Sequence, residues 1–69
     1  MIIKKNDSFV NDNDELVVVT GKHFSDYSVS IYKYNEDTDN YDIHDSDTVY
    51  TPSEMKKLTG SKEITWEEE

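Results

Sequence analysis

The sequence predicts a mainly β fold: a small, bent antiparallel sheet or barrel with one short helix before its last strand. Short runs of β-branched and aromatic residues alternate with Asn, Asp and Gly, a pattern typical of strands and turns. Helix signals concentrate in residues 51–60. With 69 residues and no cysteine, the chain has room for one domain and no disulfide to support it. We expect a single β-rich domain over residues 1–66 and a disordered acidic tail over 67–69.

The first part of the chain predicts two strands joined by a polar turn. Residues 7–10 read as a short strand that ends at the turn formers of 11–14. Residues 15–20 form the clearest strand, because they are β-branched and are closed by Gly21. The apolar run 16–19 indicates burial on both faces, or on one face with an edge that can pair between chains.

Residues 27–34 alternate in character, which predicts a strand with two distinct faces. The odd-numbered residues share one face, on which we expect Val29 and Ile31 to meet the core. The even-numbered residues share the other face, on which we expect Tyr32 and Tyr34 to be half-exposed. Residues 35–40 then form a polar turn, after which 41–43 return antiparallel and 48–50 form a further strand piece.

The helix is predicted by signals at both of its ends. Thr51 and Glu54 have the spacing of a capping box, and Pro52 occupies the first helical position. Gly60 suits the C-terminal cap. Met55 and Leu58 are expected to face inward, and residues 63–66 to form the terminal strand.

This order of elements resembles the SH3-like barrel, in which a short helical turn precedes the closing strand. Residues 7–10, 16–20, 27–34 and 51–58 carry the resemblance. It implies a fold but no ligand, because the paired aromatic and tryptophan signature of proline-binding SH3 domains is not present. The segment VYTPSEMKKL is also similar to small phage and prophage proteins in which a helix closes a β-meander.

Charge excludes several classes of partner. The net charge is −9, and all seven basic residues are lysines. Such a surface repels phosphate, so we expect no direct nucleic-acid binding and no membrane binding, and a protein with a basic surface as partner. No segment resembles a signal peptide or a membrane span, so the cytoplasm is the expected location, the host cytoplasm if the protein is phage-encoded.

The stretch 35–48 carries six carboxylates and no lysine or arginine. Numbered as an EF-hand loop from Asn35, it places Asp37 and Asp39 at ligand positions but lacks the glycine and the bidentate glutamate that such a loop requires. We therefore expect no metal site, with weak calcium binding at Asp37 and Asp39 as an open alternative.

Catalytic patterns are also missing from the sequence. His23 and His44 are the only histidines, there is no cysteine, and no serine lies in a Gly-x-Ser-x-Gly elbow. Two glycines cannot build a phosphate-cradling loop. We expect a protein that is not an enzyme and uses no cofactor.

What remains is a protein-binding surface. Alternate side chains on a strand lie about 6.6–6.8 Å apart, so Asp37/Asp39 and Asp45/Asp47 are expected to form rows of charge that resemble a phosphate path. Exposed tyrosines supply rigid contact area. The expected partner-binding residues are Tyr32, Tyr34, Asp37, Asp39, Tyr41, Asp42, Asp45 and Asp47.

The leading hypothesis is a phage-type, non-enzymatic inhibitor that occludes the basic nucleic-acid groove of a host enzyme, such as a CRISPR effector or a restriction enzyme. The alternative is an SH3-like accessory module that binds a protein partner through the face that carries Tyr32 and Tyr34. The sequence leaves the oligomeric state open.

Overall fold

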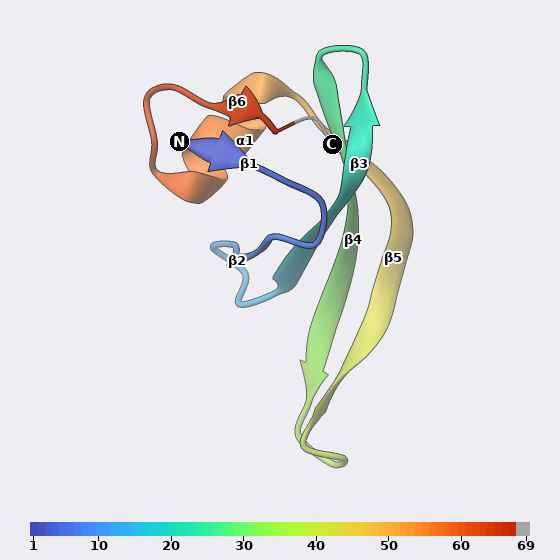
Figure 1. The fold of residues 1–69 in the computed structure, drawn as a ribbon. Helices are drawn as coiled ribbons and strands as arrows, with labels where there is room; N and C mark the ends of the chain where they lie inside the picture. The colour runs from blue at the N-terminus through green and yellow to red at the C-terminus, as the bar shows by residue number, and fades with distance from the viewer. Residues whose placement is uncertain (68–69) are drawn as a thin grey trace.

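The computed structural model describes residues 1–67 and contains two small sheets and one helix (Figure 1). Strands β2, β3, β4 and β5 form an antiparallel sheet in that order, and β1 pairs with β6 in parallel. The mainly β class and the helix before the last strand are confirmed. In chain order the elements are β1 (Ile2–Ile3), β2 (Ser8–Val10), β3 (Leu16–His23), β4 (Asp26–Asn35), β5 (Asn40–Tyr50), α1 (Pro52–Thr59) and β6 (Thr65–Trp66).

Of the two expected architectures, the open bent sheet is observed and the closed barrel is not. Among the described residues, β2 and β5 are the two edges of the larger sheet and do not pair with each other. The terminal strand β6 pairs with β1, with Ile2 opposite Thr65 and Ile3 opposite Trp66. The Glu67 N–H continues this pairing by donating to the Ile3 carbonyl at 2.8 Å. The tail expected over 67–69 is therefore anchored at Glu67, and its last two residues lie outside the described part.

Strand β3 lies inside the sheet, which corrects two expectations. It does not end at Gly21 but continues to His23, because a register shift between Val19 and Gly21 lets its pairing with β4 resume. It is flanked by β2 and β4, so the apolar run 16–19 has no free edge for pairing between chains. The two pieces expected at 41–43 and 48–50 are likewise one continuous strand, β5.

The turns of the meander use left-handed residues. Residues 36–39 connect β4 to β5, and Asp39 closes this turn at φ 57°, a conformation that aspartate tolerates better than most residues. Only Phe24 and Ser25 connect β3 to β4. Phe24 adopts φ 57° with 88% of its surface exposed, in a position where glycine is the usual residue.

The core lies on one face of the sheet, at the end where α1, β1 and β6 gather (Figure 1). Val17, Val19 and Val29 of the sheet are at most 1% exposed, and Ile3 of β1 and Met55 of α1 are fully buried against them. Full burial of a side chain of this size stabilises a fold by about 1.5–3 kcal/mol. Tyr27 completes the buried set at 3% exposure, and the partly buried side chains around it are Phe9, Ile31, Tyr50, Leu58, Ile64 and Trp66.

Helix α1 begins and ends as expected, and this fixes the direction in which Met55 points. The Thr51 side chain accepts a hydrogen bond from the Glu54 N–H at 3.3 Å, and the Glu54 carboxylate accepts one from the Thr51 N–H at 3.2 Å. Gly60 closes the helix at φ 73°, donating its N–H to the Lys56 carbonyl. The inward pair Met55 and Leu58 is confirmed.

Within residues 1–67 there is no helix with the length and apolar character needed to cross a membrane.

Removal of the N-cap is expected to weaken the whole domain. Thr51→Ala leaves the Glu54 N–H without its side-chain acceptor, which costs about 1 kcal/mol of unfolding free energy at a typical cap. The control is Ser53→Ala, an exposed substitution inside the same helix that leaves the cap intact. Urea denaturation followed by circular dichroism measures both. Equal midpoints for the two variants would show that the capping box does not support the fold.

Candidate acidic interface

The β4–β5 hairpin carries most of the acidic stretch away from the body of the molecule. Figure 1 shows it extending from the sheet at the end opposite to α1. The molecule is correspondingly elongated, with extents of 37 × 22 × 17 Å. Its tip and outer strand are exposed from Glu36 to Asp47. The carboxylates of this segment are therefore presented to solvent on a narrow two-stranded ribbon.

An aromatic pair stiffens the ribbon near its tip. Tyr34 and Tyr41 are cross-strand partners whose rings meet edge to face, with centroids 5.5 Å apart. The Tyr34 hydroxyl also donates a hydrogen bond to the Asp39 carboxylate. This bond is the main cause that raises the pKa of the Tyr34 phenol above its ordinary 10.0, since ionisation would place two negative charges side by side. Both rings remain nearly half exposed, at 46% and 47%.

Asp37 and Asp39 do not form the expected row of charges at strand spacing, because both lie in the 36–39 turn. The Asp37 N–H donates to the Asn35 side chain at 2.9 Å, which tightens the turn, and the Asp37 carboxylate stays exposed. The Asp39 carboxylate is occupied by Tyr34. The two carboxylates are thus held by turn geometry, and the spacing of alternate strand residues does not apply to them.

Asp45 and Asp47 do not form a regular row either. Val29 pairs with Thr48 and Tyr32 pairs with Ile43, so β4 advances by three residues between these pairs while β5 advances by five. The difference is taken up by two register shifts in the acidic centre of β5. The Asp45 carboxylate turns back to accept the Asp47 N–H at 3.0 Å. Hydrogen bonds from the Thr48 side chain and from that N–H lower the pKa of Asp45 below its ordinary 3.8.

The pairing register divides the hairpin into two unlike faces. Paired residues share a face, and Lys33 pairs with Asp42, so Asp42 lies on the same side as the core residues Val29 and Ile31. The Asn35 side chain donates to Asp42 at 2.9 Å on this side. The tyrosines lie on the opposite side: Tyr34 pairs with Tyr41, and Tyr32 pairs with Ile43. The expected half-exposure of Tyr32 and Tyr34 is confirmed.

Sequence reasoning missed an acidic groove that joins the hairpin to the β2–β3 turn. Its lining brings Asp14 and Glu15 of that turn close to Glu36 of the hairpin, although more than twenty residues separate them in the chain. The acidic run 11–15 is visible in the sequence. Its position beside the hairpin is not, because it follows from the pairing of β4 with β3. The groove residues are Asn13, Asp14, Glu15, Lys33, Tyr34 and Glu36.

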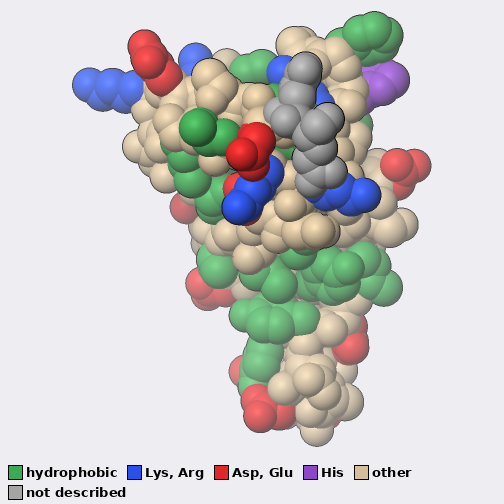
Figure 2. All heavy atoms as spheres, in the orientation of Figure 1, with side chains coloured by type: hydrophobic (Ala, Val, Ile, Leu, Met, Phe, Trp, Pro, Cys, Tyr) green, Lys and Arg blue, Asp and Glu red, His purple; other side chains and the backbone are tan. Residues whose placement is uncertain are grey.

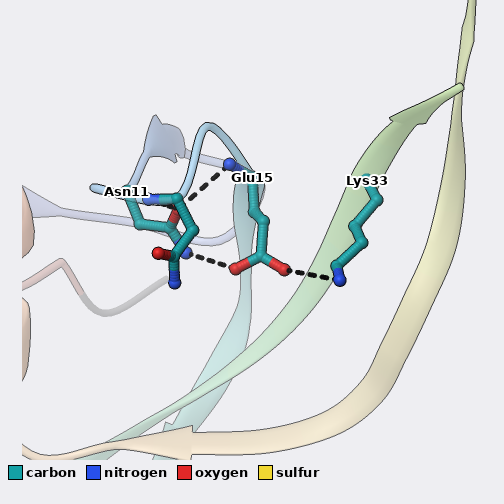
Figure 3. Close-up of polar contacts among 4 residues, drawn as sticks. Asn11, Glu15 and Lys33 are labelled. Carbon is teal, nitrogen blue, oxygen red and sulfur yellow. Dashed lines mark hydrogen bonds and ion pairs between the residues drawn. The ribbon is translucent and has the colours of Figure 1, made fainter. Parts of the chain in front are cut away.

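A small polar network holds one wall of this groove (Figure 3). The Asn11 amide donates to Glu15 Oε1 at 3.0 Å, and Lys33 Nζ lies 3.8 Å from Glu15 Oε2. Asn11 Oδ1 in turn accepts the N–H groups of Asn13 and Glu15 at 2.9 and 3.0 Å. The hydrogen bond from Asn11 is the main cause that lowers the pKa of Glu15, and Lys33 adds to it. Lys33, the lysine of the hairpin strands, is therefore already paired with a carboxylate.

Two further kinds of site were considered in the described residues: a metal site and a second groove. Within residues 1–67, no three His, Asp or Glu side chains come close enough together to hold a metal ion. A second open groove of about 250 Å³ lies between the β2–β3 turn and α1, lined by Asp12, Glu54 and Lys57 among others. Comparisons with protein-family models, with curated proteins and with solved structures gave no match.

The Tyr34–Asp39 contact predicts a late phenol titration. In the intact protein, two phenols should titrate above the ordinary pKa of 10.0, Tyr34 and the buried Tyr27, and Tyr34→Phe should remove one of the two signals. Asp39→Asn keeps the turn but removes the negative charge, so the same signal should move to lower pH. Near-ultraviolet absorbance during an alkaline titration measures all three proteins. An unchanged curve for Asp39→Asn would contradict the contact.

The lowered pKa of Asp45 predicts a pH-dependent loss of stability. The folded state binds the Asp45 proton less tightly than the unfolded state does. Its contribution is thus fully present above pH 3.8 and disappears as the pH falls through the lower folded value. Asp45→Asn should therefore destabilise at neutral pH and lose that difference in acid. Asp47→Asn removes the same charge beside it and serves as control. Urea denaturation across a pH series tests this, and a pH-independent difference would refute it.

Proposed function

We propose that the protein is a non-enzymatic inhibitor that binds another protein and occludes its basic, nucleic-acid-binding groove. The observation that supports this most directly is the projecting hairpin, which presents carboxylates and an aromatic pair on one narrow ribbon. The protein would act by occupancy alone and would need no cofactor. Host defence or nucleic-acid-processing enzymes, such as a CRISPR effector or a restriction enzyme, have grooves of the required charge.

The charge of the ribbon is not balanced locally. Residues 35–48 contribute six carboxylates and no lysine or arginine, and the neighbouring Lys33 lies against Glu15. A groove that binds nucleic acid is lined by lysines and arginines positioned for anions, so it attracts such a ribbon over long range. The acidic groove beside Glu36 adds a second point of contact, where a protruding lysine or arginine of the partner meets Asp14 and Glu15.

The aromatic pair supplies contact area that charge alone lacks. Exposed ion pairs contribute little each, whereas tyrosines are frequent among the residues that dominate binding energy. Tyr34 and Tyr41 are held rigid by their mutual contact and by Asp39, so little side-chain freedom is lost when they are buried. In this proposal the carboxylates determine the rate of association and its salt dependence, and the two tyrosine rings determine the rate of dissociation.

The test begins with capture of partners from a bacterial lysate at low salt, followed by elution with salt. An eluted protein is purified, and its binding to labelled DNA or RNA is measured by fluorescence anisotropy with and without this protein. We expect stoichiometric loss of nucleic-acid binding and an affinity between the two proteins that falls steeply with salt.

The charge variant combines Glu36→Gln, Asp37→Asn and Asp47→Asn, and it spares Asp39, Asp42 and Asp45 because their carboxylates accept hydrogen bonds within the hairpin. Three lost contacts at about 0.2–1 kcal/mol each should weaken binding by roughly tenfold. The matched control combines Asp12→Asn, Glu63→Gln and Glu67→Gln, which are exposed residues outside the hairpin, and should leave the affinity almost unchanged.

Two results would overturn the proposal. A captured protein that retains its nucleic acid when saturated excludes occlusion of the groove. If the charge variant binds normally while Tyr34→Ala does not bind, the protein is instead an accessory module that uses its tyrosine face, and the carboxylates serve solubility.

A further inference from the structure

The strand β2 leaves one edge of the larger sheet open. In the described part of the chain it pairs with β3 alone, over the three residues Ser8–Val10. The chain also bonds to β3 just beyond both ends of β2. The Val19 N–H donates to the Asp7 carbonyl at 2.8 Å, and the Asn11 N–H donates to the Glu15 carbonyl at 3.0 Å. Asp7 and Asn11 therefore direct these backbone groups toward β3.

The backbone groups of Ser8 and Val10 point the other way. Hydrogen bonding alternates along an antiparallel pair, so every second residue bonds to the partner strand. Phe9 shares the orientation of Asp7 and Asn11, and the residues on either side of Phe9 have the opposite one. Within residues 1–67 no other strand pairs with that side of β2. Two N–H and two C=O groups thus form an open strand edge.

An open groove lies beside Val10, between the β2–β3 turn and α1. Its volume is about 250 Å³, and its apolar lining consists of Val10, Leu58 of α1 and Tyr50 at the end of β5. Val10 is 57% exposed, and the other two side chains are partly buried. Figure 2 shows hydrophobic side chains at the surface over the strands below the helix, where β2 also lies in this view (Figure 1). The groove offers apolar contact next to the open edge.

We propose that β2 and this groove bind an extended segment of a partner protein, which adds to the sheet as a further strand. Main-chain hydrogen bonds select the conformation of the segment, because an extended backbone presents donors and acceptors at the spacing of the Ser8 and Val10 groups. Alternate side chains of an added strand point to the same side. Those on the side of the helix would fill the groove between Val10 and Leu58.

Charge selects the composition of the segment. The charged side chains that line the groove are Asp12, Glu54 and Lys57, two carboxylates and one ammonium group. The Glu54 carboxylate is already bonded to the N-cap, whereas Asp12 is exposed and belongs to no ion pair within the described residues. The chain as a whole carries −9. Lysine or arginine is therefore favoured at the positions of the segment that lie outside the apolar part of the groove.

The two edges of the sheet differ in their protection against a further strand. β5 carries two register shifts together with Asp45 and Asp47, and bulges and charges block pairing at an edge. β2 has the sequence Ser-Phe-Val, with no charge, no proline and no register shift. Its shortness limits the number of main-chain hydrogen bonds that it can form. Binding at β2 therefore depends on the groove and the edge together.

This inference goes beyond the proposed inhibitor function and uses none of the hairpin residues. The groove beside β2 shares only Asn13 with the acidic groove beside the hairpin. A segment bound along β2 leaves Asp37 and Tyr41 of the hairpin accessible. Binding at β2 and binding by the hairpin can therefore be measured separately on the same protein.

Selection from a displayed library of random heptapeptides against the intact protein supplies the probe. We expect enrichment of sequences in which apolar residues alternate with residues that include lysine or arginine. The enriched peptide is synthesised, and its affinity is measured by isothermal titration calorimetry. In the NMR spectrum of the protein, the amide signals of Ser8 and Val10 should shift on binding, because their N–H groups gain acceptors.

Methylation of the peptide nitrogens distinguishes strand addition from other modes of binding. Methyl groups on alternate nitrogens block hydrogen bonds along one side of a strand only, so two peptides methylated in opposite phase have the same composition and charge. One of them should bind about tenfold more weakly than the other, because it loses its main-chain hydrogen bonds to β2. Equal affinities of the two peptides would overturn the proposal.

Ser8→Pro tests the same hydrogen bonds from the side of the protein. Proline is tolerated on an edge strand where its nitrogen faces away from the neighbouring strand. The variant loses one N–H of the open edge, so it should bind the peptide roughly two- to tenfold more weakly. Ser8→Ala is the matched control, since it keeps the N–H and should bind normally. If circular dichroism shows that Ser8→Pro is unfolded, the two methylated peptides decide.

The charge variant of the hairpin should bind the peptide as the intact protein does in 0.15 M salt, where charges are screened beyond about 8 Å. Equal weakening by that variant and by Ser8→Pro would assign the peptide to the acidic surface and overturn the inference. A library that yields no enriched sequence also overturns it. So do Ser8 and Val10 signals that shift with protein concentration in the absence of peptide, because the edge would then be covered by a second copy. None of these results bears on whether the hairpin binds a basic partner.

Discussion

The packing of Ile3 and Met55 onto the valine face of β3 and β4 is the contact on which the rest of the structure depends. Val17, Val19 and Val29 form a flat apolar surface that a four-stranded antiparallel sheet cannot bury by itself. α1 and β1 cover it, and each is short, so each needs local support. The capping box fixes α1, and pairing with β6 fixes β1. Because this cover reaches only one end of the sheet, the hairpin beyond it is free to carry charge.

Charge then shapes the uncovered strands. A carboxylate on an edge strand lowers the stability of the fold little while water surrounds it. At the two register shifts of β5, the Asp45 side chain turns back and accepts a hydrogen bond from the backbone of the same strand. The same shifts break the regular edge that would otherwise attract another strand. The acidic composition of residues 44–47 and the irregular pairing of this segment are thus consistent with each other. A regular, apolar β5 would have been a site of aggregation.

Local signals predicted most of the local structure, and most of the misses are long-range. The expected row of Asp37 and Asp39 is the exception, because both lie in the 36–39 turn, inside the turn that the sequence itself predicted. The caps at Thr51 and Gly60, the alternation of 27–34 and the β-branched run of β3 each act within a few residues. Each predicted the right kind of element, although β3 continues to His23 beyond its expected end at Gly21. β1 is two residues long and is stabilised by a partner more than sixty residues away, so nothing in its own sequence marks it. The prediction of a regular row at Asp45 and Asp47 was wrong for the same reason, because the pairing register is a property of two strands together. The acidic groove needed the fold to bring Asp14 to Glu36.

The distribution of charge over the two faces of the sheet argues for more than solubility. Net charge keeps a protein soluble wherever the charges lie, so solubility alone would scatter sixteen carboxylates over every exposed strand. Instead, on the sheet face that points away from the core, the paired positions between Ser28 and Tyr34 are uncharged, while Asp42, Lys33 and Glu15 share the other face. Exposed apolar side chains such as Ile43 and Val49 on that face lower solubility, so solubility cannot account for them. A basic partner, as proposed for the hairpin, would account for carboxylates gathered on one ribbon, which solubility alone does not require.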